Sequence, residues 1–169
     1  MKNKFVYFFV LILFLFKLNI SVSEDEFIFE INSIEITDNG NSINDKNGVQ
    51  VKSKDGLKIF SDETKYSKIS KKLILIGDVV IFDTIKDIKI KSSEIEYDRN
   101  LEVIVSKGET FLNIDDKYDI KSEDFTYLRS KNIIKSNKKT IKKDKLNNKI
   151  ETNNFVYFIS KKKFISKNL

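Results

Sequence analysis

Residues 88–98 read Ile-Lys-Ile-Lys-Ser-Ser-Glu-Ile-Glu-Tyr-Asp, and a similar stretch occurs three more times along the chain. The four copies contain Tyr66, Tyr97, Tyr127 and Tyr157, which are 31, 30 and 30 residues apart. A weaker copy, over residues 29–36, precedes them. A repeat of this length predicts one structural unit that is used several times, each copy packed against its neighbours.

Apolar and polar residues alternate within each copy, and Ile, Val, Phe, Tyr and Thr are frequent, as is typical of β-strands. The alternation changes phase within residues 88–98: Ile88 and Ile90 share one parity, whereas Ile95 and Tyr97 share the other. A slip of one residue sends side chains to the opposite face of a sheet. We therefore expect a bulge or corner at the Ser-acidic step, where each strand leaves one sheet and enters a second sheet that faces the first.

Turn residues follow the tyrosines and separate them from further predicted strands. These strands lie at 73–76 and 102–106, each before a glycine, and at 79–83 and 110–114 after it. The glycines are Gly77 and Gly108, and the pairs Asn39-Gly40 and Asp55-Gly56 are signals of hairpin turns. No linker interrupts the pattern, which predicts a single all-β domain.

The first 23 residues are typical of a secretory signal peptide. Two lysines precede an apolar run over residues 5–16, and Ser21-Val22-Ser23 supplies the small residues of a cleavage site. The alternative is an uncleaved membrane anchor, but this run is shorter than the roughly 20 residues that a helix needs to cross a bilayer. We therefore expect cleavage after Ser23, export to a Gram-negative periplasm, and a mature domain over residues 24–169.

The chain contains no cysteine and no histidine. This composition excludes thiol redox chemistry, Ser-His or Cys-His nucleophiles and zinc sites of the usual kind, and the domain must fold without disulfides. No glycine-rich phosphate loop is present. A carboxylate pair such as Glu94 and Glu96 is the remaining candidate for a hydrolase, but acidic residues recur at the same position in each repeat, which favours a structural role. We expect no catalytic residue, no metal and no cofactor.

Charge is distributed unevenly along the chain. Residues 24–130 contain 16 basic and 23 acidic side chains, whereas residues 131–169 contain 12 and 2. The mature chain has a net charge of only +3, so nucleic acid is not an expected partner. The fourth repeat stops at Leu169, before its next strand, which indicates either an edge left open for a partner or a chain that continues. A basic edge would attract an acidic one, although a solvated basic tail is the alternative.

Three stretches resemble the OstA-like family of lipopolysaccharide-transport proteins: 55–66 (DGLKIFSDETKY), 73–83 (LILIGDVVIFD) and 90–98 (IKSSEIEYD). This family comprises LptA, LptC and the N-terminal periplasmic domain of LptD, and the resemblance extends over residues 28–169. It implies a V-shaped β-jelly roll of two facing antiparallel sheets, with an apolar groove for the lipid A acyl chains of lipopolysaccharide. It also implies open end strands that pair with other Lpt proteins or with a second copy, and a part in outer-membrane assembly. A cleaved signal argues against an LptC-like protein. An LptA-like protein and an LptD N-terminal domain are the two alternatives that the sequence leaves.

The candidate lipid-groove residues are those that the alternation places between the two sheets. They are Ile59, Tyr66, Leu75, Ile81, Ile90, Ile95, Tyr97, Leu112, Ile120, Phe125, Tyr127, Ile150, Phe155 and Tyr157. Burial of an acyl chain contributes about 0.8 kcal/mol per CH₂, so such a groove binds lipid without specific polar contacts. The same residues also suit a closed core, and the same period suits a structural β-solenoid of a surface or filament protein.

Overall fold

The structure, a computed structural model, describes residues 27–30, 35–46 and 48–166. Its regular elements are strands, apart from one short 3-10 helix, η1 (Asp38–Gly40). The predicted signal peptide with its cleavage after Ser23 lies outside the described residues, as do Ile31 and Ile34 of the weak first repeat. No helix in the described part of the chain is long and apolar enough to cross a membrane.

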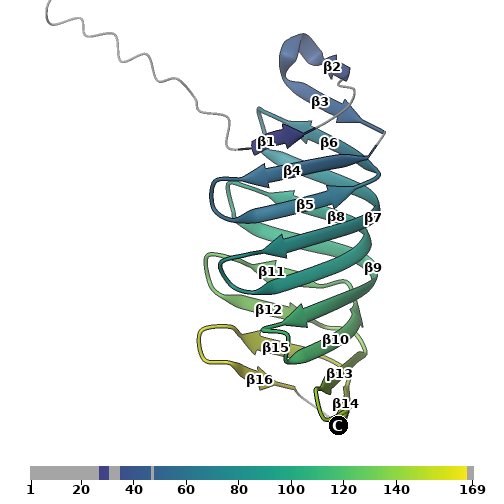
Figure 1. The fold of residues 1–169 in the computed structure, drawn as a ribbon, viewed down its shortest axis with the longest axis vertical. Helices are drawn as coiled ribbons and strands as arrows, with labels where there is room; N and C mark the ends of the chain where they lie inside the picture. The colour runs from purple at the N-terminus through teal and green to yellow at the C-terminus, as the bar shows by residue number, and fades with distance from the viewer. Residues whose placement is uncertain (1–26, 31–34, 47, 167–169) are drawn as a thin grey trace, which may run out of the picture.

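Three long strands run through both sheets of the molecule (Figure 1). They are β7 (Lys72–Asp83), β8 (Ile88–Asp98) and β9 (Val103–Ile114). Each strand bends near its middle, so that one half pairs in a first sheet and the other half pairs in a second sheet. All described strand pairs are antiparallel.

Shorter strands complete the two sheets. The first sheet adds β1 (Phe27–Glu30), β4 (Val49–Ser53), β5 (Leu57–Ser61), β10 (Tyr118–Glu123), β13 (Thr140–Asp144) and β14 (Lys149–Thr152). The second sheet adds β2 (Glu35–Thr37), β3 (Ser42–Asp45), β6 (Glu63–Ser67), β11 (Thr126–Leu128), β12 (Ile133–Ser136), β15 (Phe155–Phe158) and β16 (Lys163–Ile165). Because the three long strands belong to both, all strands are joined by one hydrogen-bonded network. The pairings give the first sheet the order β1-β4-β5-β7-β8-β9-β10-β13-β14 and the second the order β2-β3-β6-β7-β8-β9-β11-β12-β15-β16. This is the predicted β-jelly roll. The coils of a parallel β-solenoid would pair in parallel, so the solenoid alternative is wrong.

The long strands bend where the sequence changes phase. The register between β8 and β9 shifts between Ser92 and Glu94, and the register between β7 and β8 shifts around Gly77. Gly77 and Gly108 have φ angles of +74° and +73°, which glycine adopts without a steric penalty. These shifts confirm the predicted corner. The separate strands predicted before and after each glycine are instead halves of one bent strand.

Polar groups line the inside of the corners and bind one another. The hydroxyl of Thr110 donates a hydrogen bond to Ser106 Oγ (2.8 Å), and both side chains are buried. The backbone N–H of Gly108 donates to Asp124 Oδ1 (2.9 Å). The acidic residue of this corner therefore has a structural role, as its recurrence in the repeats predicted.

The repeat produces columns of apolar side chains that face each other across the core. Residues one repeat apart lie two strands apart in a sheet, because a neighbouring strand always intervenes. The second sheet contributes, in register order, Ile43, Tyr66, Leu73, Tyr97, Ile104, Tyr127, Ile134, Tyr157 and Phe164. The first sheet contributes Phe29, Val51, Ile59, Ile81, Ile90, Leu112 and Ile120, and the column ends with the basic Lys142 and the exposed Ile150.

Candidate functional site

Of the fourteen candidate lipid-groove residues, all but Ile150 belong to one continuous buried core between the sheets. The most exposed member of this group is Tyr66, at 7%. Ile150 is 41% exposed and is not brought into the core. The remaining thirteen candidates form the walls of an apolar interior that extends from β5 to β15.

One end of the interior lies at β13, β14 and β16, where the two sheets end. Lys142 stands in the inward column of the first sheet, between Ile120 and Ile150. Its ammonium lies 4.0 Å from the centre of the Tyr118 ring and 5.0 Å from that of Phe164, and burial lowers its pKa. No described strand pairs with the outer edge of β14. This end therefore presents both apolar and basic side chains.

Aromatic rings close the interior at the opposite end. The centre of the Phe27 ring lies 5.3 Å from that of Tyr66 and 5.9 Å from that of Tyr97, both edge-to-face. The Phe29 ring lies 5.5 Å from Tyr66. Such aromatic pairs add about 0.5–1.5 kcal/mol to the effect of burial alone. The two ends of the interior are therefore chemically different.

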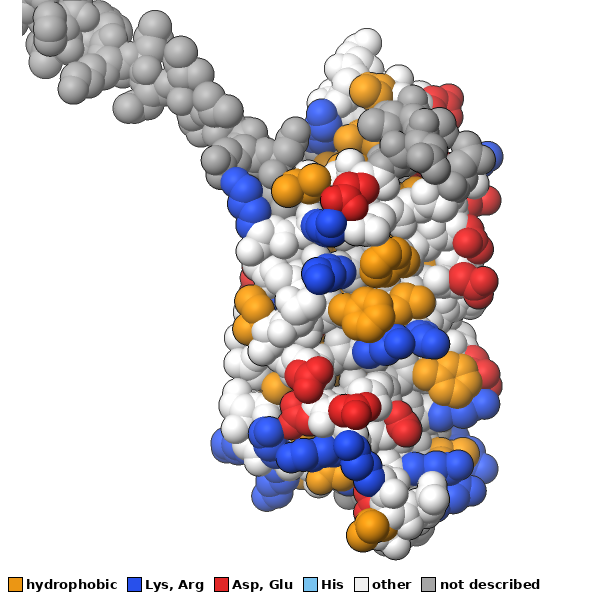
Figure 2. Space-filling view, in the orientation of Figure 1, with side chains coloured by type: hydrophobic (Ala, Val, Ile, Leu, Met, Phe, Trp, Pro, Cys, Tyr) orange, Lys and Arg blue, Asp and Glu red, His pale blue; other side chains and the backbone are white. Residues whose placement is uncertain are grey.

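The outer face of the first sheet contains a hollow of about 820 Å³. Its lining includes the lysines Lys89, Lys91, Lys121, Lys143 and Lys149. Figure 2 shows basic side chains gathered at the end of the molecule where β13 and β14 lie in Figure 1, and acidic ones along the upper part of one edge. The uneven charge of the sequence is therefore also uneven in space.

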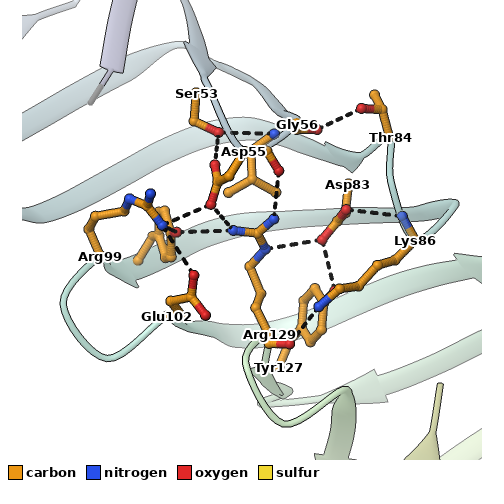
Figure 3. A network of polar contacts seen from close by, with 12 residues as sticks. Ser53, Asp55, Gly56, Asp83, Thr84, Lys86, Arg99, Glu102, Tyr127 and Arg129 are labelled. Carbon is orange, nitrogen blue, oxygen red and sulfur yellow. Dashed lines mark hydrogen bonds and ion pairs between the residues drawn. The ribbon is translucent and has the colours of Figure 1, made fainter. Parts of the chain in front are cut away.

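A polar network joins the two sheets on the side opposite the corners, where the hairpin turns lie (Figure 3). In the first sheet, Asp55 lies in the β4–β5 turn and Asp83 is the last residue of β7; Arg129 lies in the β11–β12 turn of the second sheet. Arg129 donates from Nε to Asp83 Oδ2 (3.0 Å) and from Nη1 to Asp55 Oδ2 (2.5 Å). The Tyr127 hydroxyl also donates to Asp83 Oδ2 (2.8 Å). The mouth between the two sheets is therefore closed by a nearly buried arginine.

A second arginine reaches the same carboxylate oxygen. Arg99, in the β8–β9 turn, donates from Nη1 to Asp55 Oδ2 (2.8 Å) and to Glu102 Oε1 (3.3 Å). The hydroxyl of Tyr97 lies 3.3 Å from Nη1 of both arginines. Asp55 Oδ2 is thus held between two guanidinium groups.

The charges of this network reinforce one another. Burial raises the pKa of Asp55, but hydrogen bonds from Ser53 and Arg129, together with the positive charges of both arginines, outweigh it, so this pKa lies below its usual value. Burial lowers the pKa of Arg129, but its interactions with Asp55 and Asp83 raise this pKa by more. The net result is a pKa above the usual value. The Arg129 guanidinium and the Asp55 carboxylate therefore stabilise each other in their charged forms.

The carboxylates considered for hydrolysis lie on the outer face of the second sheet. Glu94 pairs with Lys107, and Glu96 pairs with Lys72 at 2.8 Å. Each acid thus has its own lysine, and the arrangement is one of cross-strand ion pairs. No group of three or more metal-ligating side chains occurs within the described ranges.

No protein-family model and no curated protein sequence matches the chain, whereas solved structures do. The chain is similar to the crystal structure of LptH from Pseudomonas aeruginosa, the LptA homologous periplasmic component of that organism's lipopolysaccharide transport device. The TM-score is 0.56 and the sequence identity 17%, over 67% of this chain and 82% of LptH. The chain has the LptH fold. This likeness agrees with the resemblance of the repeats to the OstA-like family.

The alternation in the sequence predicted thirteen of the residues that are buried in this interior, but not the polar network at its mouth. The partners of Arg129 are 46 and 74 residues away in sequence, so no local pattern joins them. One signal was present: Arg99 and Arg129 are the only arginines in a chain of 29 lysines, and each stands two residues after a repeat tyrosine.

Proposed function

We propose that this chain is a non-enzymatic periplasmic protein of the OstA-like family that carries lipopolysaccharide by its lipid A acyl chains. The supporting observation is the apolar interior that thirteen of the candidate groove residues form within an LptH-like fold. Each CH₂ group buried there contributes about 0.8 kcal/mol. A ligand with several long acyl chains would be bound tightly by such walls.

The corners allow the two sheets to move apart without breaking either sheet. They are bulged, and Gly77 and Gly108 supply positive φ angles there. The thirteen candidate residues are buried against one another, so the core between the sheets is closely packed. Acyl chains would replace these side-chain contacts between the sheets, so the groove opens only as far as its ligand requires.

The open ends of the sheets suit docking to other Lpt proteins or to a second copy. The strands β14 and β16 end the sheets on one side, and β1 and β2 end them on the other. An edge strand presents unpaired backbone N–H and C=O groups that another strand can bind. Pairing at these edges would continue both inward columns from one protein to the next, as transport toward the outer membrane requires.

Photocrosslinking tests the lipid site. A benzophenone amino acid replaces Phe125, which is buried in the core, or Phe111, which is 46% exposed on the outer face of the first sheet. After incubation with lipopolysaccharide and irradiation, we expect a lipopolysaccharide adduct from position 125 and little from position 111. Equal adducts from the two positions, or no adduct at 125, would contradict the proposal.

A further inference from the structure

The two arginines of the chain meet at one point, although 29 other basic residues are lysine. Lysine and arginine are not interchangeable where a planar anion is bound, because a guanidinium presents several N–H donors in a fixed fork that matches phosphate and carboxylate groups. Arg99 and Arg129 occupy the same position in successive repeats, two residues after Tyr97 and Tyr127. This convergence indicates a site whose geometry requires guanidinium groups.

The carboxylates in this site differ in their burial and in how many arginines they serve. Of the two arginines, Asp83 pairs with Arg129 and Glu102 pairs with Arg99. The Asp83 side chain is 1% exposed and also accepts a hydrogen bond from the Tyr127 hydroxyl. Asp55 is shared by both arginines, its side chain is 26% exposed, and it stands on the β4–β5 hairpin turn. Removal of Asp55 would leave each guanidinium with its own carboxylate, so Asp55 is the exchangeable partner.

The site lies at the mouth of the interior. Nη1 of both arginines contacts the hydroxyl of Tyr97 at 3.3 Å, and the ring of the same tyrosine is fully buried in the inward column of the second sheet. A group bound between the arginines therefore sits directly above the apolar walls. An acyl chain attached to that group would point into the core.

We infer that Arg99 and Arg129 bind the anionic head group of an amphiphile, and that the Asp55 carboxylate occupies this head-group site when no ligand is bound. The inference rests on the proposed function, because it assigns the polar end of a ligand whose chains enter the interior. The ligand class is an acyl lipid that carries a phosphate. The head group takes the place of Asp55 Oδ2, and Asp83 and Glu102 keep the guanidiniums oriented.

Two fluorescent lipids with identical acyl chains test this inference: phosphatidate, which carries a phosphate, and diacylglycerol, which does not. Binding constants are measured for the wild-type protein, Asp55→Asn, Arg99→Gln and the matched control Lys68→Gln. Lys68 stands two residues after Tyr66, at the corresponding position of the preceding repeat. A urea unfolding curve of each variant serves as the control that it is folded under the conditions of the binding measurement.

We expect the wild-type protein to bind phosphatidate more tightly than diacylglycerol. Arg99→Gln should weaken phosphatidate binding about tenfold, the effect of one lost charge-assisted hydrogen bond, and leave diacylglycerol binding unchanged. Asp55→Asn should strengthen phosphatidate binding, because the competing charge is gone. Lys68→Gln should change neither lipid.

Equal affinity of the wild-type protein for the two lipids, or an Arg99→Gln variant that loses both equally, would overturn the head-group site and leave the acyl-chain proposal intact. Failure of both lipids to bind would refute the acyl-chain proposal and the head-group site with it. Inorganic phosphate is the third probe. If phosphate raises the melting temperature of Asp55→Asn while phosphatidate shows no preference over diacylglycerol, the arginines form a free-anion site and the head-group assignment is wrong.

Discussion

Arg129 is the residue that connects the two sheets at the mouth, and it also neutralises the buried Asp83. We expect Arg129→Met to lower the free energy of unfolding by about 3–5 kcal/mol, because it leaves the buried Asp83 carboxylate without its positively charged partner. The double variant Asp83→Asn/Arg129→Met should recover part of this loss, since the buried charge is then absent. Urea unfolding of the three proteins gives the values. A loss below about 1 kcal/mol in Arg129→Met would place the pair among weak surface ion pairs.

Asp55 makes the mouth sensitive to acid. Its pKa is lowered in the folded protein, so its contribution to stability is present above the unfolded value of about 3.9 and is lost as the pH falls through the lower folded value. We expect wild-type protein to be more stable than Asp55→Asn at pH 7, and the difference to shrink below about pH 4. Urea unfolding at pH 7 and pH 3 measures it. A difference that stays constant with pH would show that Asp55 acts through packing alone.

Single residues were predicted from sequence where their role is set locally. The inward position of Tyr97 follows from alternation with Ile95, and the structure confirms it. The contacts of Arg129 follow from the approach of turns that lie in different sheets, which no local pattern encodes. The exposure of Ile150 was missed for a related reason: its alternation is correct, but burial requires a further strand beside β14, and the described residues provide none.

Among the elements, β7 and β9 provide an internal comparison because both bend at a glycine with nearly the same φ. A Cβ at Gly77 would lie 2.4 Å from Asp62 Oδ2 and 2.9 Å from Asp62 Cβ, whereas nothing lies within 4 Å at Gly108. Gly108→Ala should therefore cost only the conformational penalty, about 1–2 kcal/mol. Gly77→Ala should cost more, because the Asp62 side chain must also move. Unfolding free energies of the two variants decide this, and equal losses would mean that Asp62 moves aside freely.

The elements also show how far alternation predicts structure. The change of phase between Ile90 and Ile95 predicted a corner, because side chains on both sides of the corner must face the same core. Alternation could not show whether the chain ends one strand at Gly77 or bends and continues. The continuous strand is favoured because Asp62 N–H donates to Gly77 O (3.0 Å) at the bend. Backbone pairing with the neighbouring segment, between β5 and β6, therefore continues through the corner.

At the scale of the whole molecule, the uneven charge governs association. Lys142 and Lys149 lie in the last two strands of the first sheet, β13 and β14, and the earlier part of the sequence is acidic. Head-to-tail pairing would bring the opposite charges together, so we expect association to weaken as salt rises toward physiological ionic strength, where the Debye length is about 8 Å. Analytical ultracentrifugation at low and physiological salt measures this. Association that does not respond to salt would assign docking to backbone pairing and apolar contacts alone.

The repeat also gives the molecule a unit of length. Each thirty-residue copy advances every sheet by two strands, as the steps from Tyr66 to Tyr97 and from Tyr97 to Tyr127 show. Neighbouring strands are spaced by about 4.8 Å, so one copy extends the molecule by roughly 10 Å. Duplication or deletion of a whole copy would change the span by one step and keep both columns in register. An insertion of one residue within a strand would instead turn the following side chains to the opposite face, so the reach of such a protein across a gap grows by whole copies.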